Sequence, residues 1–318
     1  MRRSLLLPLI LLVTARCSAP EAPSSSSAPP APEARRYLLE RVDDAAVVQL
    51  YADGFSALPL REKTLIYHLT QAVLAGRDIY IDQKHPRALE MRGMLEQIVA
   101  HPSGVEAATL AEITRYTKLF WLNNGPYNNL TARKFVLTCT PDALRAAATA
   151  AAAQGARFAT REGETLEAML ARLQPMFFDP AVDPIVTNKN PAPGQDLLLA
   201  SANNLYSGVS MADLKGFREQ YGLNSRLVKR DGRLIEEVYK ADGMYGPQIR
   251  EIIRHLEAAQ PFATPAMARA LAALVTFYRT GEVRDREAYD IAWVQDNNSP
   301  VDTINGFIEV YLLSLIHI

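Results

Sequence analysis

The sequence predicts a mainly α-helical protein with a minor β part, which places it in the α+β class. Two observations predict this class. Apolar residues recur at helical spacing through most of the chain after Tyr37, and one stretch from 224 to 246 changes to the period of two that strands have. There are no internal repeats and no GxGxxG motif. The part beyond the N-terminal leader is long enough for one large domain or two ordinary ones.

The first 17 residues (1–17) have the pattern of an export signal. Arg2 and Arg3 precede an apolar run, Leu5 to Val13, that is too short to span a bilayer. Cys17 follows, and this arrangement resembles a bacterial lipoprotein, in which the cysteine carries a lipid. The alternative is an ordinary signal cleaved near Ala19. Both kinds of signal predict an exported protein of the periplasm or cell envelope. Membrane attachment is expected only through a lipid on Cys17.

Residues 18–36 are rich in Pro, Ser and Ala, and such a composition cannot bury enough surface to fold. We expect a flexible tether there, followed by the folded part of the chain from 37 to 311. Charged residues make up 22% of the sequence and balance to a net charge of -1. No global field therefore attracts nucleic acid, and none is expected as a partner.

The pattern of the first half of the folded part predicts a series of helices. Pro59 opens the first and Gly76 is expected to close it, whereas Thr140 is a typical N-cap and Pro175 is expected to end a short helix. Apolar periodicity and these signals predict helices over 59–76, 85–101, 104–122, 140–158 and 163–175.

The second half begins with a long irregular connection, 179–208, of the kind that often borders a binding cleft. Asp231-Gly232 then suits a two-residue turn between two strands of a hairpin. Helical periodicity returns over 246–260, 264–281 and 283–293.

No catalytic motif stands out. No two of the five histidines have the spacing of a helical zinc site, and no nucleophile elbow or phosphate-binding loop is present. Cys139 alternates with Val136 and Thr138 as in a half-buried strand, and no nearby histidine in the sequence suggests an activated thiolate. No residue of this chain is assigned a catalytic or metal-binding role.

Two loops carry candidate binding residues. The segment 121–135 places four asparagines, a glycine and a tyrosine between a helix and a strand, and amide side chains can both donate to and accept from a peptide backbone. In the segment 293–307, Asp296 and Asp302 flank a turn, and a carboxylate there could bind the ammonium group of a substrate. Both loops could instead be turns that satisfy only their own backbone.

Four fragments in order make these loops part of one pattern. They are LYADGF, LPLREKTLIYHLTQAVLAGRDI, NNGPYNNLTARKF and WVQDNNSPVDTINGFIEVY, and together they resemble the dipeptidyl peptidase III family, M49, of zinc metallopeptidases. The resemblance extends from about Val47 to Tyr311. It implies the N-terminal lobe of a two-lobed metallopeptidase that removes dipeptides from the N-terminus of short peptides.

The resemblance also implies roles for individual residues. Asp302 corresponds to the acidic residue that pairs with the substrate amino group, while Ile304 replaces a tyrosine that contacts the reacting peptide. The edge that binds the substrate backbone corresponds to Asn124, Gly125, Tyr127 and Asn129.

Zinc is the cofactor of the family, held by a helical HExxGH motif and a further glutamate, and this sequence contains no such motif. Residues 312–318 match nothing in the family. We therefore expect an N-terminal fragment that lacks the zinc lobe, binds no zinc and is inactive alone, from a gene truncated or misread after Tyr311 or Leu312. The alternatives are a lipoprotein that binds peptides without cutting them, or a helical scaffold.

Overall fold

The structure is a computed structural model that describes residues 35–308. The expected export signal 1–17, with Cys17, and the tether up to residue 34 lie outside the described residues. The expected unmatched tail 312–318 also lies outside them.

Helices dominate the described part of the chain, so the predicted mainly α, minor β class is confirmed. The helices are α1 (Leu60–Lys84), α2 (Ala88–Ala100), α3 (Ala107–Asn123), α4 (Pro141–Ala153), α5 (Leu166–Phe178), α6 (Gly246–Ala259), α7 (Pro265–Thr280) and α8 (Val283–Val294), with short 3-10 turns at η1 (Asp53–Ala57) and η2 (Gln260–Phe262).

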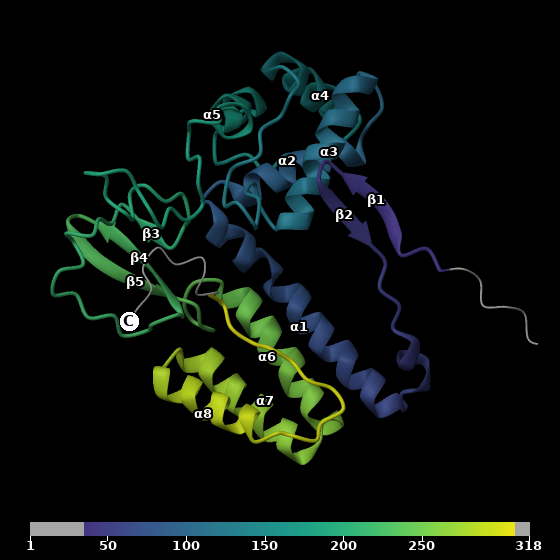
Figure 1. Ribbon diagram of the computed structural model, residues 1–318, viewed down its shortest axis with the longest axis vertical. Coiled ribbons are helices and arrows are strands. Elements are labelled where there is room, and N and C mark those ends of the chain that lie inside the picture. Colours follow the sequence, from purple (N-terminus) through teal and green to yellow (C-terminus); the bar gives the residue numbers. More distant parts are fainter. Residues whose placement is uncertain (1–34, 309–318) are drawn as a thin grey trace, which may run out of the picture.

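Helix α1 runs between two groups of helices (Figure 1). On one side α2 to α5 enclose a core that includes Met91, Tyr116 and Phe177. On the other side α6, α7 and α8 enclose a second core with α1, to which Leu65 and Ile79 of α1 belong. One long helix therefore supports both groups, and a groove along α1 can take side chains from both.

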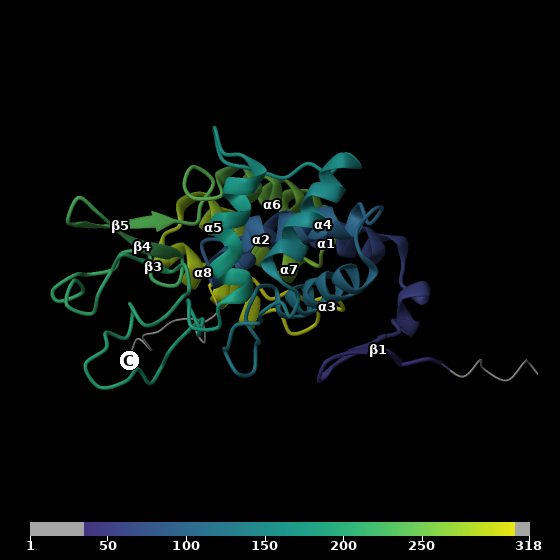
Figure 2. The same ribbon diagram turned by 90° about the horizontal axis from the view of Figure 1, so that it is seen from above.

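Two small sheets lie at the ends of this arrangement (Figures 1 and 2). The strands β1 (Leu38–Val42) and β2 (Ala45–Val48) form an antiparallel hairpin. The second sheet joins β3 (Tyr206–Ser207), β4 (Ser225–Arg230) and β5 (Arg233–Val238) in that order. Asp231 and Gly232, with φ of 50° and 74°, form the turn between β4 and β5, as the sequence predicted.

Several expected boundaries were wrong. Helix α1 does not end at Gly76 but continues for eight residues to Lys84, because the glycine lies where α6 packs closely: a Cβ on it would lie 3.2 Å from the Ile252 Cδ1 atom. Pro175 lies inside α5 rather than at its end. The buried Met176 and Phe177 continue the helix beyond it, and their burial in the core outweighs the backbone donor that proline lacks.

Two further expectations need correction. The stretch around Cys139 belongs to no strand and bends at residues 138–139. Among the described residues, the nearest ladder contacts before it are isolated bridges at Arg133 and Lys134. The β1–β2 hairpin was not predicted, because its residues alternate weakly and most are exposed on both faces. The connection 179–208 is irregular as predicted, except that its end forms the short strand β3.

Candidate functional site

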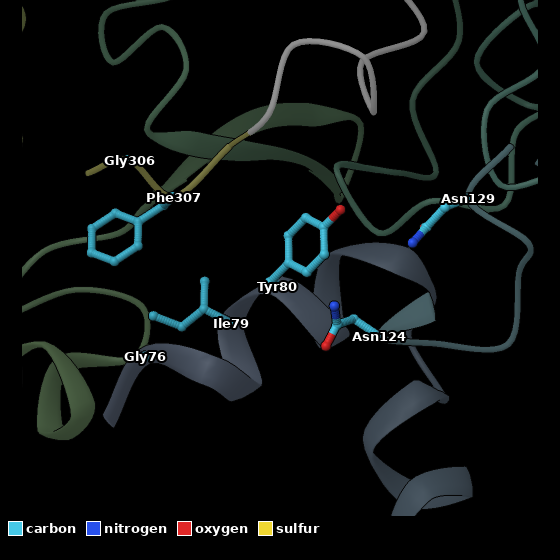
Figure 3. A pocket seen from close by; sticks show the side chains of 7 residues that line it. All are labelled: Gly76, Ile79, Tyr80, Asn124, Asn129, Gly306 and Phe307. Atoms are coloured by element: carbon cyan, nitrogen blue, oxygen red, sulfur yellow. The ribbon is translucent and has the colours of Figure 1, made fainter. Parts of the chain in front are cut away.

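The site is built on the C-terminal half of α1. Gly76, Ile79 and Tyr80 lie on one stretch of the helix, where the spacing of three and four residues brings them to the same side. The missing side chain of Gly76 leaves room between α1 and its neighbours. The Tyr80 ring stands above the helix at the middle of the site (Figure 3).

The first loop reaches this site from the end of α3. Asn124 adopts the left-handed conformation, with φ of 50° and ψ of 40°, and its backbone N–H caps the helix by donating to Phe120 and Trp121. Asparagine tolerates this conformation better than most residues. The cap turns the chain sharply, so that the Asn124 side chain projects toward α1 (Figure 3).

The second loop reaches the site from the other end of the described chain. The Gln83 Nε2 atom donates to the Phe307 carbonyl at 2.7 Å, so α1 itself binds this segment. The Phe307 ring packs on Tyr278 of α7, with centroids 4.8 Å apart. These two contacts hold residues 303–307 along α1 on the side opposite the first loop.

The two loops and α1 enclose two adjoining cavities. One has a volume of about 420 Å³ and is lined by Gly76, Ile79, Tyr80, Asn124, Asn129, Gly306 and Phe307. The other, of about 240 Å³, shares Gly76, Tyr80, Gly306 and Phe307 with it and continues toward α6 along Thr303 to Asn305. Tyr80 stands between Phe307 on one side and Asn124 and Asn129 on the other (Figure 3). We call these adjoining cavities the α1 groove.

The structure distributes the candidate residues of the first loop unequally. Asn124 and Asn129 line the α1 groove. Gly125 packs against α1, where a Cβ would lie 3.1 Å from both the Cβ and the Cγ of Lys84, so only glycine allows this close approach. Tyr127 is fully buried and its hydroxyl donates to the Asp183 carbonyl at 2.9 Å. Tyr127 therefore supports the loop from beneath.

Asp302 lies at the beginning of the second loop. Its Oδ1 atom accepts from the Trp293 Nε1 atom at 2.8 Å and from the Thr303 N–H at 2.7 Å. The residue is exposed, and no hydrogen bond to its Oδ2 atom is seen within residues 35–308. Asp302 itself does not line the α1 groove, but the next residue, Thr303, does. One carboxylate oxygen thus anchors the loop to α8, while among the described residues the other is left for a further partner.

Sequence reasoning missed the helical floor of the site. Gly76 was interpreted as a helix stop, and Ile79 and Tyr80 were not considered as lining residues. A glycine followed by about two more turns of sequence without a helix breaker is a signal for close packing rather than for a helix end.

No group of three or more His, Cys, Asp or Glu side chains that could hold a metal ion occurs within residues 35–308. The Nδ1 atoms of His68 and His255 lie 3.3 Å apart, but the Arg254 guanidinium lies 2.8 Å from the other ring nitrogen of His255. These residues do not fit a zinc ion, which needs three or four ligands.

The class of protein follows from a comparison with family models. The model of "Peptidase family M49" matches residues 194–314, which include β3 to β5, α6 to α8 and the second loop of the site. This part of the chain is M49-like, and the family resemblance read from the sequence is confirmed.

The match to the M49 model is confined to these 121 residues, which are 38% of the chain. A solved structure, "Structure of DPP III from Caldithrix abyssi", is similar with a TM-score of 0.42 and 17% identity over 77% of this chain. The match spans 35% of the length of that structure. A search of curated protein sequences returned no match.

Proposed function

We propose that the α1 groove binds short peptides, and that the chain is the substrate-binding part of an exported zinc-dependent dipeptidyl peptidase. The observation that supports this most directly is the convergence of two loops, about 180 residues apart, on the C-terminal half of α1. The first supplies Asn124 and Asn129, and the second supplies the backbone around Gly306. Amide groups and an open backbone are suited to an extended peptide, which needs both donors and acceptors along its length.

In this proposal Asp302 binds the amino terminus of the peptide. Its Oδ1 atom is held by Trp293 and Thr303, so the carboxylate is oriented before any ligand arrives. The Oδ2 atom of this exposed residue can then accept a charge-assisted hydrogen bond from an ammonium group. Preorientation of this kind reduces the entropy lost on binding.

The described residues would contribute binding and orientation, and no bond-breaking step is assigned to them. A dipeptidyl peptidase of this family uses a zinc ion, and residues 35–308 do not assemble its ligands. No helix among these residues is long and apolar enough to cross a membrane. Export to the periplasm or envelope, with or without a lipid on Cys17, rests on the sequence pattern of residues 1–36 and remains part of the proposal.

The test measures peptide binding by isothermal titration calorimetry at pH 7, with tetra-alanine and its N-acetylated form. We expect tetra-alanine to bind more tightly by at least about tenfold, since the acetyl group removes the charge that Asp302 recognises. Asp302→Asn should abolish this preference, whereas Asp296→Asn, a carboxylate of the same segment that accepts from Ser299 instead, should retain it.

A second variant tests the groove itself. Asn124→Gly deletes the amide while keeping a residue that tolerates the left-handed conformation, and it should weaken binding of both peptides alike. Asn298→Gly, in the exposed turn before Asp302, is the matched control. Absence of binding to the unaltered chain would refute the proposal. Binding with chelator-sensitive release of dipeptides would show that zinc ligands exist outside residues 35–308, and binding without release would favour a peptide-binding lipoprotein.

A further inference from the structure

A third cavity adjoins the α1 groove and shares Asn129 with it. It has a volume of about 460 Å³ and lies between the turn at 128–132 and the segment 185–190. Its lining consists of Lys84, Asn128, Asn129, Leu130, Thr131, Ala132, Ile185, Val186, Thr187, Asn188, Lys189 and Asn190. The lining thus contains two lysines, four asparagines and two threonines but no carboxylate. We call it the Lys84 cavity.

Backbone hydrogen bonds fix the two walls of the Lys84 cavity relative to each other. The Lys134 N–H donates to the Pro184 carbonyl at 3.0 Å, and the Val186 N–H donates to the Ala132 carbonyl at 3.0 Å. The Tyr127 hydroxyl adds a third link to the Asp183 carbonyl. The buried tyrosine of the first loop therefore helps to shape this cavity.

Lys84 is the last residue of α1, and it is only 1% exposed. Its Nζ atom donates to the Asn129 Oδ1 atom at 2.6 Å and lies 4.9 Å from the centroid of the Tyr80 ring. No carboxylate among residues 35–308 forms a recorded ion pair with it. A buried cation whose only recorded partners are a neutral amide and an aromatic ring is unusual, because lysine is rarely buried without an opposite charge.

We propose that the Lys84 cavity binds a carboxylate of the peptide, with the Lys84 ammonium as its buried cationic anchor. The inference rests on the proposed function, since the cavity shares Asn129 with the α1 groove and a peptide can extend from one into the other. The carboxylate is either the C-terminus of a short peptide or an acidic side chain. Lys84 is a specificity-determining residue in this assignment and takes no part in bond cleavage.

The charge state of Lys84 agrees with this role. Burial lowers the pKa of Lys84 to about 8 in the ligand-free protein, so the amine is still largely protonated at pH 7. A carboxylate entering the cavity would favour the charged form and raise this pKa. The second lysine of the lining, Lys189, adds positive charge at the cavity edge.

The experiment compares three peptides on the full chain by calorimetry: tetra-alanine with a free C-terminus, its C-terminal amide, and an amide with glutamate at the fourth position. We expect the free acid or the glutamate amide to bind at least about tenfold more tightly than the tetra-alanine amide. If the free acid binds more tightly, the carboxylate is the C-terminus of the peptide, and if the glutamate amide binds more tightly, it is an acidic side chain. The preference should decline between pH 7 and pH 10 as Lys84 loses its proton.

Lys84→Met is the decisive variant, because methionine keeps the apolar stem that packs on Gly125 and removes only the charge. It should abolish the preference for a carboxylate. Lys118→Met, which removes an exposed lysine paired with Glu40, should leave the preference intact. If all three peptides bind equally, or if Lys84→Met keeps the preference, the inference fails while the proposed function stands. If no peptide binds, both fail together.

Discussion

Gln83 and Phe307 are joined by a hydrogen bond of 2.7 Å from the side-chain amide to the backbone carbonyl, across 224 positions of the sequence. Gln83 is fully buried near the end of α1, and the contact ties the segment 303–307 to the helix that forms the floor of the site. A side-chain amide of the floor therefore helps to hold one wall of the α1 groove in place.

Removing that amide should release the segment. We expect Gln83→Ala to destabilise the protein by about 1–2 kcal/mol, because it leaves the Phe307 carbonyl without this donor and opens a small void. Hydrogen–deuterium exchange should increase most in residues 303–308. Gln49→Ala deletes an exposed amide that donates to the neighbouring Leu50 carbonyl, and it should change neither the stability nor the exchange of residues 303–308. Equal exchange in both variants would show that Phe307 is held by its ring alone.

Gly76 should not tolerate a large side chain. A Cβ at this position already lies 3.2 Å from the Ile252 Cδ1 atom, so we expect Gly76→Leu to cost about 1–3 kcal/mol by forcing α1 and α6 apart. It should also weaken peptide binding, since Gly76 lines both parts of the α1 groove.

The control for Gly76 is Gly93 in α2, where an added Cβ meets no atom within 4 Å. Gly93→Leu should stabilise the protein by up to about 1 kcal/mol, as expected when a better helix former replaces glycine. Chemical denaturation measures both variants. Similar stability of the two would contradict the close packing of α1 on α6.

The stability of the protein should depend on the titration of Lys84. Burial lowers its pKa from 10.5 to about 8, so the unfolded chain binds the proton more tightly than the folded chain. Between pH 8 and pH 10.5 the unfolded state therefore carries more protons, and the free energy of unfolding rises with pH by up to about 1.4 kcal/mol per unit.

Urea denaturation at pH 7.5, 8.5 and 9.5 should show the free energy of unfolding rising with pH for the original chain but not, by this cause, for Lys84→Met. The variant should be the more stable of the two at pH 7.5, and the gap should narrow as the pH rises. Lys118→Met serves as the control for the removal of an ordinary lysine. Parallel pH profiles for Lys84→Met and the original chain would mean that the ammonium is hydrated.

His255 should make the contact between α1 and α6 sensitive to acid. Burial, followed by the neighbouring Arg254, lowers the pKa of His255, and its Nδ1 atom lies 3.3 Å from that of His68. Glu251 acts in the opposite direction but does not reverse the shift. The stability that neutral His255 provides is present above pH 6.5 and is lost as the pH falls toward its folded pKa.

Between pH 7 and pH 5.5 we expect the free energy of unfolding to fall more steeply for the original chain than for His255→Gln, which has no titrating ring at this position. The difference in slope should be at most about 1.4 kcal/mol per pH unit. Thermal melting at a series of pH values measures this difference. His101→Gln, a histidine at the end of α2 whose ring lies near the Gln97 carbonyl, should keep the acid sensitivity of the original chain.

Local signals in the sequence predicted most of the helices and the main hairpin. Thr140 accepts from the Ala143 N–H at 3.1 Å as an N-cap should, and Asp231-Gly232 forms the expected turn. Caps and tight turns depend on a few neighbouring residues, so a short stretch of sequence is enough to identify them. The same reasoning failed at Gly76 and Pro175, where packing against distant residues continues a helix that local signals would end.

The candidate site also has features that local sequence identifies and features that depend on distant contacts. Asn124, Asn129 and the loop around Asp302 could be identified as candidates from their side-chain chemistry and their resemblance to a known family. That these residues lie around one cavity could not be identified from the sequence, because their placement depends on α1. Tyr80 and Gly76 of this helix form the floor of the cavity, and Gln83 binds the Phe307 carbonyl. The sequence by itself determined most of the helices, the β4–β5 hairpin and the resemblance to the M49 family over residues 194–314. Only the tertiary structure determined which loops share a cavity and that Lys84 is buried beside it, because contacts between residues far apart in the chain depend on the packing of whole helices.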